Sequence, residues 1–194
     1  MASVMAEPPA EAGVATATAE RLITADEFAE MALDGPYELI KGRLVPMSRP
    51  GDIHGAVCLA IGSLLRPWAK ANGQRAYSND VGVVVEEGPD TVRGPDLAVG
   101  PRRPLTGKAL REPPTLIVEV LSPSNTRTDV LGKLSQFFAA GVREAWVFDP
   151  STREAEVFRP DRSVRRVLAD GSFETEELPG FSATLAECFE DLDG

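Results

Sequence analysis

The chain has 194 residues, 43% of them hydrophobic, a length that suits one domain with a sizeable core. Its 30 acidic and 20 basic residues give a formal net charge of −10, which argues against the broad basic surface on which most nucleic-acid binding depends. Two distant cysteines and one histidine exclude a disulfide framework and the usual zinc-ligand spacings, so a zinc site would need mostly carboxylates.

The N-terminal segment has the composition of an unfolded tail. It is rich in Ala, Glu, Pro and Thr, and it lacks a positively charged start and a continuous apolar run. We therefore expect no signal peptide and no membrane span, as in a soluble cytoplasmic protein. Residues 1–20 are expected to form a disordered tail, because they cannot bury enough apolar surface to offset the entropy of ordering. A single folded domain is predicted over residues 21–194.

The first half of the domain predicts two helices and a hairpin. A capping-box pattern at residues 24–27 indicates the start of a short helix. Two short apolar runs, at residues 37–40 and 43–47, flank a Lys-Gly pair and predict a tight hairpin. Apolar residues then recur at helical period from residue 53 to 68, and Asn72-Gly73 marks the end of this long helix.

The second half predicts the main sheet. Apolar runs at residues 81–87, 96–100 and 115–121 have strand length and are expected to form its centre. An amphipathic helix over residues 128–140 leads into another buried strand at 144–150, as in a crossover between parallel strands. The remaining sequence alternates polar and apolar residues, which is typical of antiparallel edge strands. The predicted fold class is α/β (α+β), with a mixed central β-sheet flanked by helices and additional antiparallel strands.

Two carboxylates interrupt neighbouring apolar runs. Glu119 lies inside LIVEV, where an unpaired carboxylate would be costly to desolvate, and Asp96 begins the preceding run. Adjacent strands would bring both acids to one face, where they repel each other unless a cation lies between them. Hard oxygen ligands completed by water describe a Mg²⁺ or Mn²⁺ site, which polarises a phosphoryl oxygen and activates water.

A series of motifs carries a family resemblance. The segments RGPDLAV and PPTLIVEVLSPSNTRTDVLGKLSQFFAAGVREAWVFDP, with YELIKGRLVPM and PGDIH upstream, resemble the Uma family of endonucleases. That family has a restriction-endonuclease-like fold within the PD-(D/E)XK nuclease superfamily, and the resemblance covers about residues 21–188. It implies that Asp96 is the aspartate of the PD motif and Glu119 the acid of the second half-motif. The metal would then be held by Asp96, Glu119 and the backbone carbonyl of Val120.

The sequence departs from the superfamily where its lysine should stand. The E-x-K signature reads Glu119-Val120-Leu121, so the lysine that orients the attacking water must come from elsewhere. Lys133 is the candidate, because it lies beside the apolar stripe of the following helix, and related proteins use a lysine in this helix. It would position the water and offset charge on the phosphate. From the pattern alone, a lysine lying along the helix with its ammonium in water is the favoured interpretation.

Glu38 and His54 are further candidates for the site. Periodicity alone would place Glu38 in water, whereas the family resemblance makes it a third acid that binds a second metal or holds a water. His54 is the only histidine and lies near the start of the long helix. It suits a general base or a phosphate contact near the metal, and equally a solvent-facing position. A serine hydrolase is discounted, because no G-x-S-x-G elbow is present.

The leading interpretation is an Mg²⁺- or Mn²⁺-dependent endonuclease that hydrolyses phosphodiester bonds of DNA. Asp96 and Glu119 would bind the metal, and Lys133 would orient the water. The alternative is a catalytically weak or inactive nuclease-fold module that binds nucleic acid or a protein partner, which the acidic composition and the missing E-x-K lysine favour. RNA and small phosphoesters remain possible substrates. A homodimer is expected, because nucleases of this superfamily often pair two sites across a two-fold axis.

Overall fold

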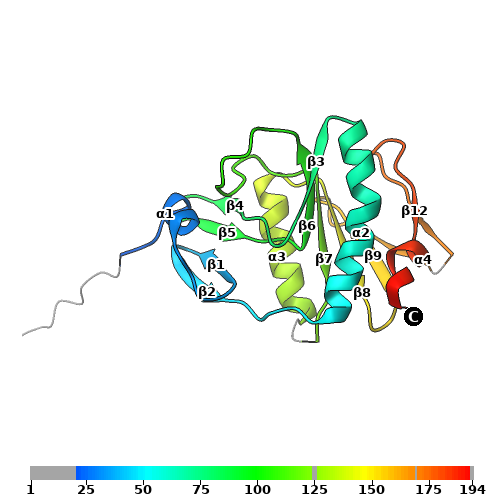
Figure 1. Cartoon of the computed structure of the whole chain (residues 1–194), viewed down its shortest axis with the longest axis horizontal. Coiled ribbons are helices and arrows are strands. Elements are labelled where there is room, and N and C mark those ends of the chain that lie inside the picture. The colour runs from blue at the N-terminus through cyan, green and yellow to red at the C-terminus, as the bar shows by residue number, and fades with distance from the viewer. Residues whose placement is uncertain (1–20, 124–125, 169, 193–194) are drawn as a thin grey trace, which may run out of the picture.

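A six-stranded mixed sheet forms the centre of the molecule (Figure 1), with strand order β10-β9-β8-β7-β6-β3. The computed structural model describes residues 21–123, 126–168 and 170–192, so the predicted tail over residues 1–20 lies outside the described residues. None of the helices described is long and apolar enough to cross a membrane.

The predicted crossover is the middle of this sheet. β7 and β8 are parallel neighbours joined through α3, whereas every other neighbouring pair of the sheet is antiparallel. Thr126 caps the start of α3 with its side chain, and Gly141 ends the helix with a φ of 109°. The bounds of these elements are β3 Gln74–Ser78, β6 Leu97–Pro101, β7 Leu116–Val120, α3 Arg127–Ala140, β8 Glu144–Asp149, β9 Glu154–Phe158 and β10 Val164–Val167.

Two helices cover opposite faces of the central sheet. The predicted long helix is α2, Asp52–Ala71, which lies along the central strands (Figure 1). Its residues Val57, Ile61 and Leu65 pack into one core cluster with Leu97, Val118 and Trp146 among others. On the other face, α3 packs Val130, Leu134 and Phe137 against alternate residues of β6 and β7, namely Ala98 and Ile117. The alternation of side chains along each strand therefore builds two cores.

A second sheet holds the N-terminal hairpin. Its order is β2-β1-β5-β4, with β1 Tyr37–Ile40, β2 Arg43–Pro46, β4 Val83–Glu86 and β5 Thr91–Arg93. The predicted hairpin is confirmed, and Lys41 and Gly42 form its turn with φ values of 51° and 72°. The short helix α1, Ala25–Glu30, begins with the predicted capping box at Thr24.

The predicted place of residues 81–87 in the central sheet was wrong, and one strand of that sheet was not predicted. The run at residues 81–87 is not part of the central sheet, because β4 pairs with the nearby β5 and β5 pairs in turn with β1. The place beside β6 belongs instead to β3, whose sequence QRAYS is too polar to predict a core strand. Near the C-terminal end, β11, Ser172–Phe173, pairs antiparallel with β12, Ala183–Thr184, in a separate small sheet. The chain then forms α4, Leu185–Cys188, and a 3-10 turn over Glu190–Leu192.

Candidate metal and catalytic centre

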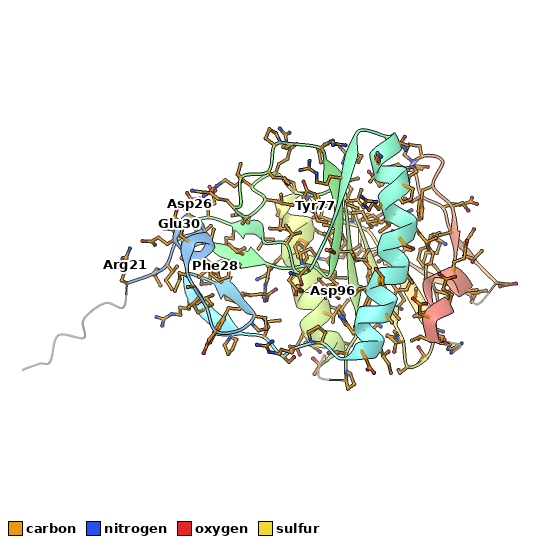
Figure 2. The ribbon with its side chains drawn as sticks, in the orientation of Figure 1. Arg21, Asp26, Phe28, Glu30, Tyr77 and Asp96 are labelled. Carbon is orange, nitrogen blue, oxygen red and sulfur yellow. The ribbon has the colours of Figure 1, made fainter. Side chains whose placement is uncertain are left out.

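Asp96 and Glu119 lie on neighbouring strands at one end of the central sheet. β6 pairs with β7 in the register Leu97↔Val118, so continuing this register by one residue sets Asp96 opposite Glu119. The Asp96 carboxylate accepts a hydrogen bond from the Val120 amide, with an N···O distance of 2.6 Å. Figure 2 labels Asp96 between the central strands and α2. The fold thus brings together the two acids that the sequence paired.

Lys133 reaches this end of the sheet from α3. Its ammonium lies 2.9 Å from Oε1 of Glu119 and donates a hydrogen bond to Oε2 at 3.0 Å. It also donates to the Gly94 carbonyl oxygen at 2.7 Å, and its side chain is only 14% exposed. The interpretation as a lysine with its ammonium in water is therefore wrong for this residue. The cause is the position of Lys133 next to the buried stripe of α3, which turns it toward β7 rather than toward solvent.

Burial and charge compete at this pair. Burial raises the pKa of Glu119 to about 8, although the Lys133 ammonium acts in the opposite direction. Burial alone would lower the pKa of Lys133, but the carboxylates of Glu119 and Glu38 outweigh burial and raise it. Lys133 is thus a stable cation, whereas Glu119 is an acid held close to protonation.

Glu38 closes the same site from the second sheet. Its Oε1 accepts a hydrogen bond from the Gly94 amide at 3.0 Å and lies 3.6 Å from the Lys133 ammonium. Its Oε2 is 2.5 Å from Nη1 of Arg93, and Nε of Arg93 donates to Gln136 on α3 at 2.7 Å. Glu38 is buried, so the expectation from periodicity that it faces water was wrong. Cleft-facing polar contacts with Arg93, Gly94 and Lys133 explain this inward position.

His54 lies against Asp96 from the first turns of α2. Its Nε2 is 3.2 Å from Oδ2 of Asp96, and this hydrogen bond raises the pKa of His54. On the other side of the ring, Nδ1 lies 3.6 Å from the sulfur of Cys58, one helical turn further on. Ligand atoms of His54, Cys58 and Asp96 all lie within 4.8 Å of one another. The i, i+4 spacing of His54 and Cys58 on a helix was the signal for this cluster, which the sequence analysis missed.

The geometry of this cluster does not favour a soft metal. The two contacts use different ring nitrogens, Nδ1 toward the thiol and Nε2 toward the carboxylate, so neither nitrogen contacts both groups. Burial also raises the pKa of Cys58 far above the ordinary value, so a metal at this thiol would have to displace its proton. His54 thus contacts the Asp96 carboxylate on one side of its ring and the Cys58 thiol on the other.

These side chains line a cleft of about 360 Å³, which contains Glu38, His54, Asp96, Glu119 and Lys133. Asp80, another acid in this cleft, was missed by the sequence analysis because it lies in a loop with no strand pattern. Burial and the nearby Asp96 raise the pKa of Asp80. Asn79 and Asp80 both have positive φ, 63° and 52°, a conformation that costs energy in residues with a side chain.

The residues fit a hard divalent cation. Asp96 and Glu119 offer carboxylate oxygens to one cleft, and Val120 also lines it. Oε1 of Glu119 is buried and accepts no hydrogen bond from the described residues, although it lies within ion-pair distance of Lys133. This oxygen has the Lys133 ammonium as its ion-pair partner, and it keeps lone pairs that would be available to a metal ion.

Comparison with known proteins supports the same assignment of family. The model of the Uma2 family, described as "Putative restriction endonuclease", matches residues 25–186. The fold is similar to a crystal structure described as "a putative nuclease belonging to DUF820 from Anabaena variabilis ATCC 29413", with a TM-score of 0.73 at 20% identity over 87% of this chain and 98% of that chain. No curated protein matches the sequence. Because the family model spans most of the chain, the resemblance is confirmed and this protein belongs to the Uma2 restriction endonuclease family.

Proposed function

We propose that this protein is a metal-dependent endonuclease that hydrolyses phosphodiester bonds of DNA. The observation that carries the proposal is the contact of Lys133 with Glu119 beside Asp96. In this superfamily the lysine of the E-x-K signature follows the acid of the second half-motif and orients the attacking water. Here α3 supplies an ammonium to that acid, although the strand itself carries Leu121 at the expected position. Two acids and a lysine therefore lie together in the cleft, although the lysine is not at its usual position in the sequence motif.

We assign each residue of the cleft a separate role in hydrolysis. Asp96 and Glu119, with the carbonyl of Val120, would hold Mg²⁺ or Mn²⁺, which when bound polarises the phosphate and favours ionisation of water. Lys133 would orient the water for attack on phosphorus and offset the charge that develops on the phosphate oxygens. Glu38 and the Gly94 carbonyl fix the ammonium of Lys133 in place. His54 fixes the Asp96 carboxylate through its Nε2 contact.

The alternative is a nuclease-fold module that binds nucleic acid or a protein partner with little or no catalysis. The net charge of −10 favours the protein partner within this alternative, because the protein as a whole repels a polyanion. The two functions differ in one measurable respect, since only the first requires a metal-dependent product.

The experiment is a cleavage assay on single-stranded and double-stranded DNA and RNA with Mg²⁺, Mn²⁺ or EDTA. Asp96→Asn and Lys133→Ala are compared with wild type, and the exposed Asp191→Asn and Lys108→Ala serve as matched controls. We expect cleavage that EDTA abolishes and that falls about 100-fold or more in both cleft variants, while the controls keep wild-type rates. The binding module becomes the better account if none of the substrates is cut with either metal.

Two further parts of the proposal concern the chain as a whole. We expect a homodimer, since nucleases of this superfamily often pair two sites across a two-fold axis. Light scattering coupled to gel filtration measures the mass of the assembly directly, and a monomer at the concentration of the cleavage assay contradicts the expected dimer.

We also expect one domain over residues 21–194, so limited proteolysis should remove only the first 20 residues.

A further inference from the structure

The catalytic cleft opens into a groove between α2 and the chain that runs from β3 to β6. The groove has a volume of about 610 Å³, and it shares His54, Asp80 and Asp96 with the cleft. Further along, its lining is mostly apolar and small, with Leu59 and Gly62 from α2 and Tyr77 from β3. Leu59 is 70% exposed, although it lies in the middle of a helix that packs on the sheet. A ligand that leaves the cleft on this side would meet an apolar surface.

The far end of the groove is basic. Arg66 lines the groove and also a neighbouring pocket of about 300 Å³, whose other lining residues include Lys70 and Arg102. Arg66 and Lys70 lie one turn apart on α2, and Arg102 follows β6, with its amide bonded to the Gly73 carbonyl at 3.3 Å. No Asp or Glu of the described chain lines this basic pocket. Three cations from two segments thus converge at one place in a strongly acidic protein.

These three cations differ from most others on the molecule. Ion pairs with carboxylates engage many of the basic residues elsewhere, such as Lys41, Arg103, Arg111 and Arg127. Arg66, Lys70 and Arg102 make no ion pair with any residue that the structure describes. Arg75 also lines the pocket, but its guanidinium donates to the Arg103 carbonyl at 2.8 Å.

A second observation at the basic pocket also indicates a ligand. Oε1 of Gln74, which lines this pocket, is buried and has no hydrogen-bond partner among the described residues. Buried polar atoms of folded proteins nearly always have a partner from the protein, from water or from a ligand. The pocket therefore combines unpaired cations, which suit phosphate oxygens, with an unpaired acceptor, which suits a donor such as a base N–H or water.

We propose that this groove binds an unpaired strand of nucleic acid, and that Arg66, Lys70 and Arg102 bind its phosphates on one side of the scissile bond. Phosphates complement unpaired cations, and the apolar middle of the groove suits the faces of bases, which only an unpaired strand leaves open. The inference rests on the proposed function, because it takes the His54 and Asp96 end of the groove as the place of cleavage.

The length of α2 gives the reach of this binding site. Arg66 and Lys70 follow His54 by twelve and sixteen residues on one helix, and a helix rises about 1.5 Å per residue. The cations therefore lie roughly 18 to 24 Å from His54 along the helix axis. At about 3.4 Å per nucleotide this distance corresponds to about five to seven nucleotides in B-form spacing, and to fewer in an extended strand. A small phosphoester would not reach from one end to the other.

The test measures binding by fluorescence anisotropy in EDTA, so that no strand is cut. The probe is a labelled single-stranded DNA of about 20 nucleotides, titrated with the full chain at several salt concentrations. One variant removes the basic pocket, and a matched variant removes the same number of charges from exposed positions elsewhere. They are R66Q/K70Q/R102Q and R143Q/R162Q/R165Q. Thermal unfolding followed by circular dichroism establishes that each variant is folded.

We expect the pocket variant to bind about 10-fold or more weakly than wild type at low salt. The slope of log K against log salt should fall by about 2, since each phosphate contact on a single strand contributes about 0.7. The matched variant should stay close to wild type. An equal loss in both variants, or no loss in either, overturns the site. Equally tight binding of a blunt duplex of the same length overturns the assignment to an unpaired strand.

Failure of this inference is distinguishable from failure of the proposed function. If wild type cuts DNA with metal and the pocket variant binds and cuts as well as the matched variant, the nuclease stands and the groove does not bind the strand. If no metal supports cleavage but only the pocket variant loses affinity in EDTA, the groove binds the strand and the catalytic role is wrong.

Discussion

The Lys133 ammonium lies 2.9 and 3.0 Å from the two oxygens of the Glu119 carboxylate. Glu119 lies in β7 with apolar neighbours on both sides, and this contact explains how a buried strand tolerates it. The sequence analysis expected a cation between Asp96 and Glu119 and assigned a divalent metal to that role. The chain supplies an ammonium of its own for part of that charge, so Glu119 has a partner before any metal binds.

Removal of this ammonium should lower the stability of the fold as well as the rate of cleavage. We expect Lys133→Met to lower the free energy of unfolding by about 3 kcal/mol, because it leaves Glu119 buried without its cation. This value lies at the low end for broken buried pairs, since Glu119 can take up a proton. Urea unfolding measures the change. The control is Lys108→Met, whose pair with Asp26 is half exposed and screened by solvent, so its loss should be much smaller. Equal losses in the two variants would show that the Glu119 contact is no stronger than a surface pair.

Gly94 occupies a position where a side chain would not fit. A Cβ at this position would lie 2.9 Å from both Cβ and the carbonyl oxygen of Asp80, whereas the Gly94 amide and carbonyl bind Glu38 and Lys133. Gly94→Ala should therefore lower stability by about 1 to 3 kcal/mol and reduce cleavage, because the loop with Asp80 must move.

The matched control for this substitution is Gly132→Ala. Gly132 lies in α3 with open space around its Cα, so alanine there should raise stability by about 0.5 to 1 kcal/mol. Thermal or urea unfolding of both variants tests the pair, and a neutral Gly94→Ala would contradict the argument from close approach.

Glu144 is a buried acid with a structural role far from the cleft. It is fully buried and accepts hydrogen bonds from Trp146, Arg159 and Thr175 at 2.7, 3.1 and 2.8 Å. We expect Glu144→Ala to cost about 3 kcal/mol, because it leaves three donors without their acceptor. Cleavage per folded molecule should stay at the wild-type rate. The exposed Glu176→Ala is the control, and a stability loss of the same size there would contradict the role of the network.

Cys58 should be dispensable for metal binding. Its thiol contacts Nδ1 of His54 rather than the carboxylate, and burial raises its pKa, which disfavours the thiolate that a metal would need. We expect Cys58→Ser to leave Mn²⁺ affinity, measured by calorimetry, within about 2-fold of wild type, whereas Asp96→Asn removes a carboxylate ligand and weakens it strongly. A 10-fold loss in Cys58→Ser would instead place the thiol among the ligands.

Local patterns predicted the parts of the fold that local interactions determine. The Lys41-Gly42 hairpin and the β7-α3-β8 crossover each depend on residues close in sequence, and both are confirmed. The sheet of β4 was predicted wrongly, because strand pairing depends on distant partners that periodicity does not identify. β3 was missed because it is an edge strand with little apolar pattern.

The candidate site shows the same limit. Asp96 and Glu119 stand out because a charge interrupts an apolar run. The sequence around Lys133 is typical of a solvent-facing lysine, so only the family resemblance indicated a place in the site. Arg93 and Asp80 carry no such signal. Their places in the cleft follow from tertiary contacts, with Glu38 for Arg93 and with Gly94 for Asp80, which no single segment of sequence encodes.

The cleft draws its acids from two different sheets, and this has a consequence for how activity arises during folding. Asp96 and Glu119 belong to the central sheet, whereas Glu38 comes from the sheet of the N-terminal hairpin. Lys133 lies within 4 Å of both Glu119 and Glu38, so its ammonium is fully held only when the two sheets have docked. A chain that had folded only its central sheet would have the acids of the motif but a loosely held lysine. The complete set of Lys133 contacts therefore exists only in a chain whose two sheets are docked.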